Sequence, residues 1–141
     1  MSAIPIFSAD AYVSWLGELD LRSGRVAEAE ARLGEAAALL GADHGMWSAA
    51  CLGAIGEARV ARDRDGGTGD LDRAIALARA GGWRLNLAEA LCRRARALND
   101  PGALREAERI ADAMGVGERS RVRMDLARTA ALLDLAGHNQ P

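Results

Sequence analysis

Apolar residues recur along this chain at intervals of three and four, the period of an amphipathic helix. The stretch from Tyr12 to Gly41 shows this pattern most regularly, with Gly24 interrupting it near the middle. Ser8 is a suitable helix cap before the first stripe, and a serine followed by Gly24 is a suitable end. The pattern therefore predicts two helices here, over residues 8–22 and 26–40.

The rest of the chain continues in the same way, and glycines or prolines separate the apolar stripes. The stretch 63–70, DRDGGTGD, has three glycines that disfavour a helix, so it predicts a loop with Asp70 as the cap of the next helix. Asp100 and Pro101 suit the cap and the first position of another helix. Five further helices are expected, over residues 45–62, 71–79, 84–98, 102–114 and 118–136.

Composition supports an all-α protein. Half of the 141 residues are hydrophobic but only 4% are aromatic, and the apolar mass is mostly Ala and Leu, which favour helices. The formal net charge of −2 does not suggest a nucleic-acid-binding domain, which usually carries a basic excess. All 18 basic residues are Arg, which fits the codon usage of a GC-rich genome better than a dedicated anion site.

Compartment and cofactors follow from what the sequence does not contain. The N-terminus has no basic leader followed by an apolar run, and no segment approaches the length of a membrane span. We therefore expect a cytoplasmic protein without membrane contact. Cys51 and Cys92 lie far apart without metal-ligand spacing, so we expect reduced thiols, no metal and no cofactor. The stretch 63–70 lacks the acidic residues that a calcium loop needs at its fifth and twelfth places.

One spacing recurs between the helices. From Gly17 to Ala29 is twelve residues, and Leu33 and Gly41 follow Ala29 by four and twelve. Ala95 to Ala107 repeats the interval of twelve. The second unit, in which Ala58 is the small residue, carries four extra residues that we expect the glycine-rich loop to absorb. Ala130 takes the small position in the last helix.

This spacing resembles the tetratricopeptide repeat, although Val13, Asp20, Leu33 and Gly41 stand where that pattern has Trp, Tyr, Phe and Pro. The resemblance implies one domain over 1–141, an α-solenoid of about seven helices stacked as antiparallel pairs. The pairs would span about 8–41, 44–81 and 83–115, followed by a capping helix at about 118–137. The chain is also similar to repeat regions of bacterial ATPase-type transcriptional regulators. A generic helical solenoid or bundle is the alternative.

The family binds peptides or protein segments on a concave face made by the first helix of each pair. The resemblance therefore implies a scaffold or regulatory module with a peptide or protein partner. Its groove residues would be Glu18, Arg22, Arg59, Arg62, Glu89, Arg93 and Arg96. The carboxylate clamp that some family members use for acidic tails is matched here by Arg93 alone, so that activity is not carried over.

Two interpretations of the arginines remain open. Arg59 with Arg62, and Arg93 with Arg96, each share a helix face, so four arginines would form a patch for an acidic peptide or phosphate. Alternatively, they lie on a solvated face with intramolecular partners such as Asp63 and Glu89, which we favour.

Trp47 and Trp83 lie near the starts of two helices and are either packing anchors or aromatic ligand contacts. A small-molecule-binding protein or a small enzyme using the concave cavity is the alternative function, although no pair of residues indicates catalysis. A large Ala/Leu patch on the last helix, or on the outer face of the first helix, would favour a homodimer.

Overall fold

The structure, a computed structural model, describes residues 25, 27–28, 31 and 45–138, with the side chains of 49–134 in the last stretch. Within this part of the chain there are five helices and no strand, which confirms the all-α prediction. The helices predicted over 8–22 and 26–40 lie almost wholly outside the described residues, as does the stretch around Gly17. Ala27, Glu28 and Ala31 are helical, as expected. The helices are α3 (Gly45–Arg59), α4 (Arg64–Gly81), α5 (Arg84–Leu98), α6 (Pro101–Met114) and α7 (Arg121–His138).

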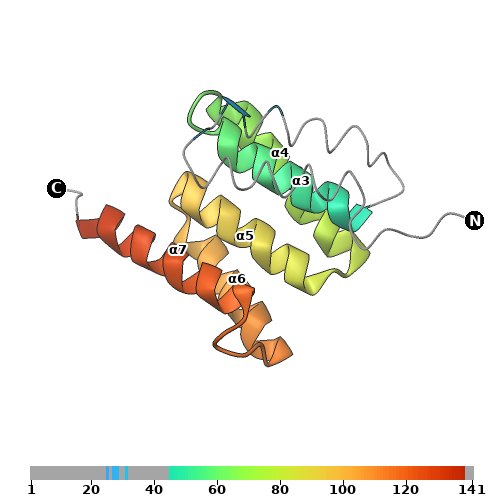
Figure 1. Ribbon diagram of the computed structural model, residues 1–141, viewed down its shortest axis with the longest axis vertical. Coiled ribbons are helices and arrows are strands. Elements are labelled where there is room, and N and C mark those ends of the chain that lie inside the picture. The colour runs from blue at the N-terminus through green and yellow to red at the C-terminus, as the bar shows by residue number, and fades with distance from the viewer. Residues whose placement is uncertain (1–24, 26, 29–30, 32–44, 139–141) are drawn as a thin grey trace, which may run out of the picture.

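Helix α5 is the centre of the described structure, and Figure 1 shows it between the α3/α4 pair and the α6 and α7 helices. It contacts all four other helices. Helix α3 packs on α4, and α7 packs on both α5 and α6. The contacts therefore form a row in which α3 adjoins α5 and α5 adjoins α7. Helix α4 contacts α3 and α5, whereas α6 contacts α5 and α7.

The ends of α5 and α6 follow from local chemistry that the sequence predicts. Asn99 ends α5 in the left-handed conformation, with φ of 53°. The Asp100 side chain accepts a hydrogen bond from the backbone N–H of Ala103 at 3.2 Å, so it caps α6. Pro101 is the first residue of α6, where its missing N–H costs nothing. Helix α5 matches its predicted range, and α6 begins one residue earlier than its own predicted start.

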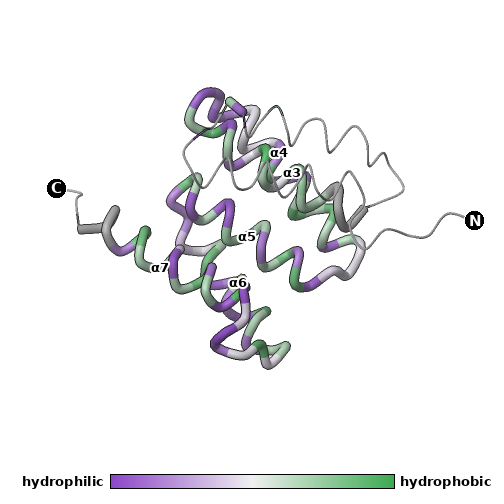
Figure 2. Tube along the Cα trace, in the orientation of Figure 1, coloured by the Kyte–Doolittle hydropathy of each residue, from purple (hydrophilic) through white to green (hydrophobic). Residues whose placement is uncertain are grey.

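The core of this half of the molecule lies where α5, α6 and α7 meet. Its buried residues are mostly small: Ala88, Leu91, Cys92, Ala95, Ala103, Leu104, Ala107, Ala111 and Leu126. Figure 2 shows the apolar positions alternating with polar ones along each of these helices. Alanines bring helix axes close together, so a core with few large side chains still packs densely.

Residues 64–70 of this stretch are helical, so the predicted loop is wrong. Helix α3 ends at Arg59, three residues earlier than predicted, and α4 already begins at Arg64. Asp63, not Asp70, caps α4, because its Oδ1 accepts a hydrogen bond from the Gly66 N–H at 3.0 Å. The glycine-rich stretch that we expected to absorb four extra residues as a loop is therefore part of a helix.

Gly67 of this stretch and Gly56 of α3 are needed because α3 and α4 approach each other backbone to backbone. A Cβ on Gly67 would lie 2.7 Å from the Val60 nitrogen and 2.8 Å from the Gly56 carbonyl oxygen. A Cβ on Gly56 would lie 2.8 Å from the Gly67 carbonyl oxygen. Real Cβ atoms do not come this close, so both positions exclude every other residue. Tertiary packing here outweighs the low intrinsic helix propensity of glycine, about 1 kcal/mol per residue.

Helix α7 begins at Arg121, three residues after its predicted start. Ser120 caps it, because its hydroxyl accepts a hydrogen bond from the Arg123 N–H at 3.1 Å. The prediction placed the start too early because Glu118 and Arg119 are good helix formers, while the cap that stops the helix is a single serine. Leu126 and Thr129 form the buried side of α7.

Candidate functional site

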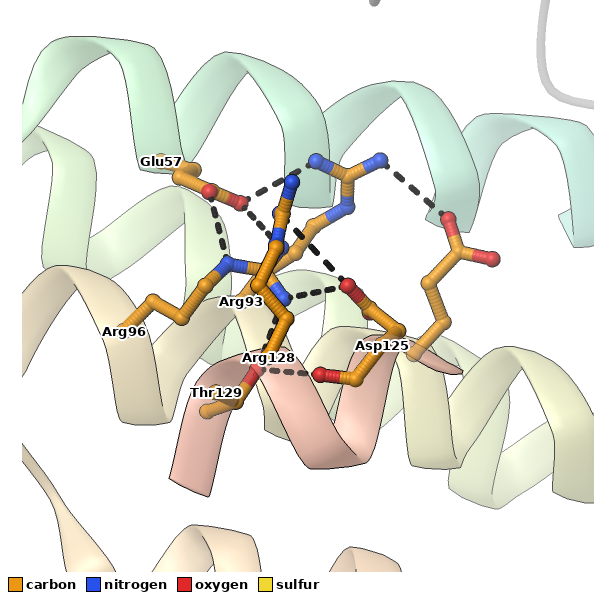
Figure 3. A network of polar contacts seen from close by, with 7 residues as sticks. Glu57, Arg93, Arg96, Asp125, Arg128 and Thr129 are labelled. Carbon is orange, nitrogen blue, oxygen red and sulfur yellow. Dashed lines mark hydrogen bonds and ion pairs between the residues drawn. The ribbon is translucent and has the colours of Figure 1, made fainter. Parts of the chain in front are cut away.

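A network of charged side chains runs across the row of α3, α5 and α7 (Figure 3). Glu57 comes from α3, Arg93 and Arg96 from α5, and Asp125 and Thr129 from α7. These residues lie 29 to 39 positions apart along the chain wherever the network passes between helices. The network is therefore a product of the fold rather than of local sequence.

The Glu57 carboxylate is shared by two arginines. Its Oε2 accepts hydrogen bonds from Arg93 Nη1 at 3.1 Å and from Arg96 Nη2 at 2.9 Å. Its Oε1 accepts a third hydrogen bond from Arg96 Nε at 3.1 Å. Arg96 thus binds the carboxylate in the two-pronged manner that gives arginine–carboxylate pairs their strength and fixed geometry. The Arg93 and Arg96 side chains are only 6% and 8% exposed, so both charges are held away from water.

Arg96 carries the network on to α7. Its Nη1 donates to Asp125 Oδ1 at 2.7 Å and to the Thr129 hydroxyl at 3.0 Å. The Thr129 hydroxyl in turn donates to the Asp125 backbone carbonyl at 2.7 Å, which orients its oxygen toward Arg96. A fully buried threonine is thereby satisfied at both its donor and its acceptor.

The two ends of the network are more accessible than its middle. Arg93 Nη2 donates to Glu89 Oε1 at 3.2 Å, and the Glu89 side chain is 26% exposed. At the other end Arg128 lies 3.5 Å from Asp125 Oδ1, and its side chain is 48% exposed. Three carboxylates and three guanidinium groups take part, so their formal charges cancel.

Charge pairing keeps the buried groups ionised. Burial alone would raise the pKa of Glu57, but the positive charges of Arg93 and Arg96 and their hydrogen bonds outweigh it and lower that pKa. Burial also opposes the charge of Arg96, yet the carboxylates of Glu57 and Asp125 raise its pKa above the ordinary value. The network is therefore charged at neutral pH and needs no bound ion to balance it.

The structure brings together three of the residues predicted for the groove, Glu89, Arg93 and Arg96, but it places Arg59 elsewhere. Arg59 Nη1 donates to Asp70 Oδ2 at 2.7 Å and Nη2 to Asp63 at 3.1 Å, so this side chain joins α3 to the start of α4. Arg62 is exposed in the turn between these two helices. Glu18 and Arg22 lie outside the described residues. Intramolecular partners of the expected kind, Asp63 and Glu89, are both present, and the binding role of all seven residues stays a prediction.

Sequence reasoning missed Glu57, Asp125 and Thr129. The available signal was weak: Glu57 interrupts an apolar run between Ala54 and Ala58, both of which are buried. Nothing in the sequence alone says that its partners lie on α5. A polar residue inside an otherwise small apolar face is the pattern that would have identified it.

Trp83 has a local structural role. A Cβ on Gly81 would lie 2.6 Å from two atoms of the Trp83 ring, so the indole covers the glycine backbone at the end of α4. Trp83 is only partly buried there, directly before α5. Trp47 lies in α3 with its side chain outside the described set, so a ligand-contacting role for the two indoles stays a prediction.

The cysteines do not form a reactive centre. Cys51 and Cys92 are both buried, and neither is in a disulfide. Burial raises the pKa of the Cys92 thiol to about 12, and the nearby Asp125 carboxylate adds to this, so the thiol is neutral at physiological pH. In the described part of the chain no group of three His, Cys, Asp or Glu side chains is arranged to hold a metal ion. None of the described helices is long and apolar enough to cross a bilayer.

Comparison with protein-family models, with curated proteins and with solved structures finds no match for this chain.

Proposed function

We propose that the chain is a tetratricopeptide-like α-solenoid that binds a peptide or protein segment and acts as a scaffold or regulatory interaction module. The row of α3, α5 and α7 supports this proposal, because each of these helices adjoins the next. Helix α4 contacts both α3 and α5, and α6 contacts both α5 and α7. Small residues recur at matching places along this row. Ala58 and Ala95 are buried, 37 residues apart, and Ala130 follows 35 residues later. A repeating unit of this length is typical of paired-helix repeats.

The charged network supports a preformed binding surface on this row. It ties three helices together through paired side chains, so the row is ordered before any partner arrives. Binding to an ordered surface avoids the entropic cost of arranging it. The network is the single observation that carries the proposal, because it spans the helices that would have to act together.

The network also limits what the partner is. The Arg93 and Arg96 side chains are already paired with Glu57, Glu89 and Asp125, so an acidic segment would have to displace an internal carboxylate to pair with them. We therefore propose a segment that binds chiefly through backbone and apolar contacts, with Glu89 available at the margin. A strongly acidic partner is the less favoured form of the same function. The two free cysteines fit a reducing, cytoplasmic location.

The test is site-specific photocrosslinking in the source cells. A benzophenone side chain at Glu89 should give a discrete adduct with one partner, which mass spectrometry would identify. The same group at Ala76, an exposed residue of α4, should give none. With the identified segment as a peptide, Glu89→Ala should weaken binding by about five- to tenfold, whereas Arg73→Ala should not. Equal labelling at positions 89 and 76 would count against a groove on the row.

A further inference from the structure

The outer side of α7 is an apolar helix face that no described element covers. We call it the α7 face and define it as Met124, Ala127, Arg128, Ala131 and Leu132. Met124 is 64% exposed and Leu132 is 48% exposed. Ala127 and Ala131 are exposed between them at helical spacing. On the opposite side of the same helix, Leu126 and Thr129 are buried against the rest of the molecule.

The α7 face repeats the surface by which α5 holds α7. On α5 that surface includes Cys92 and Arg96, which both interact with Thr129 of α7. The spacing of 35 residues that relates Ala95 to Ala130 relates Cys92 to Ala127 and Arg96 to Ala131. Both of these alanines are exposed. The face of α5 that contacts α7 therefore has a counterpart on α7 itself, and the side chains of this counterpart are smaller.

The charges at the edge of this face are self-complementary. Among the described residues Arg128 has one ion pair, with Asp125 Oδ1 at 3.5 Å, and it competes there with Arg96 at 2.7 Å. The Asp125 carboxylate is itself partly accessible, since this side chain is 19% exposed. One helix thus offers a weakly held guanidinium and a carboxylate oxygen less than one turn apart. A two-fold axis would bring the guanidinium of each copy close to the carboxylate of the other copy.

We propose that a second copy of this chain docks on the α7 face, with the two α7 helices antiparallel about a two-fold axis that passes between Ala127 and Arg128. Met124 and Ala131 lie equally far from this axis, on either side of it along the helix. The register therefore places Met124 of each copy over the small Ala131 of the other. Arg128 then lies about 3 Å along the axis from the other copy's Asp125, at 1.5 Å per residue. The interface is isologous, so every contact occurs twice. This proposal does not rest on the proposed function: it needs no bound peptide, and its apolar contacts lie on the outer side of α7, although Asp125 and Arg128 also belong to the charged network.

Sedimentation velocity across the micromolar range tests the docking. The wild-type chain should approach twice its 14.8 kDa mass as its concentration rises. Met124→Glu should raise the dimer dissociation constant by at least about a hundredfold, because it puts two carboxylates into the apolar contact with Ala131. Leu77→Glu, at a 38% exposed position of α4, should leave it unchanged. A monomeric wild type, or a dimer that tolerates Met124→Glu, would overturn the proposal. Circular dichroism of each variant checks that it folds.

A disulfide test distinguishes this register from any other dimer. Ala127→Cys lies beside the proposed axis, so mild oxidation should link two copies through it. Ala76→Cys should not link, and the native thiols are buried and should not interfere. Failure of Ala127→Cys to link, while Ala76→Cys does, would place the contact elsewhere and overturn the proposed face. Neither result bears on the photocrosslinking at Glu89.

Discussion

Helix α3 meets its two neighbours in opposite ways, although the residues responsible are adjacent in sequence. Toward α4, Gly56 presents no side chain, and the backbones of the two helices touch through Gly67. Toward α5, Glu57 reaches out to Arg93 and Arg96, and long charged side chains fill the space between the helices. The first contact depends on shape alone and the second on charge, so the two should fail for different reasons and by different amounts.

The largest effect is expected on the glycine side. Gly56→Leu puts a bulky side chain where even a Cβ would lie 2.8 Å from a backbone oxygen of α4. Because backbone atoms cannot move aside as a flexible side chain does, the two helices must separate. We expect a loss of more than about 4 kcal/mol in the free energy of unfolding, measured by urea denaturation.

The matched control for this variant is Gly69→Leu. Gly69 lies in the neighbouring helix α4, where a Cβ meets no atom within 4 Å. This change should be neutral or stabilising by a few tenths of a kcal/mol up to about 1 kcal/mol, because leucine is the better helix former. If both variants lost the same stability, glycine would matter here for flexibility and not for close approach.

A smaller loss is expected on the charged side. Glu57→Gln keeps the shape of the side chain but leaves two buried arginines without their shared negative charge. We expect a cost of about 2–3 kcal/mol, because the pair is broken rather than replaced. Thermal and urea unfolding at pH 7 measure it. An unchanged midpoint would mean that Glu89 and Asp125 balance both arginines by themselves.

The same variant has a pH signature that the glycine variants lack. The pKa of Glu57 is lower in the folded protein, so its contribution to stability is present above the unfolded-state pKa and is lost as pH falls through the folded-state pKa. The difference in stability between wild type and Glu57→Gln should therefore shrink below about pH 4. For Gly56→Leu the difference from wild type should not depend on pH. A constant difference for Glu57→Gln would contradict the charged network.

The two sides of α3 also differ in what the sequence could predict. Helix caps are local, so Asp100 and Pro101 predicted the α5–α6 boundary to within one residue. The glycines of 63–70 were misjudged because local propensity favours a loop, while the contact with Gly56 that favours the helix is made by another element. The network was partly anticipated, since Glu89 and Arg93 share one helix. Glu57 and Asp125 join only when three helices are placed side by side.

A change at the α5–α6 boundary should cost less than either side of α3. Asp100→Ala removes the cap of α6 and the 3.1 Å contact with Arg94 Nε. We expect a loss of about 1 kcal/mol, the usual value of a helix cap. Asp100→Asn keeps a capping oxygen but loses the charge, so it should retain most of the stability. If asparagine were as harmful as alanine, the ion pair with Arg94 and not the cap would be the stabilising interaction.

The smallest effect is expected for an ion pair whose geometry looks as good as any in the network. Arg79 of α4 donates to Glu106 of α6 at 2.8 Å, slightly shorter than the contacts of Glu57. The two side chains are 56% and 34% exposed, however, so water competes for both charges and salt screens them. Arg79→Ala should change the free energy of unfolding by no more than about 0.5 kcal/mol. A double-mutant cycle with Glu106→Ala at low and high salt isolates the coupling. A coupling as large as the effect of Glu57→Gln would mean that distance, and not burial, sets the strength of ion pairs in this protein.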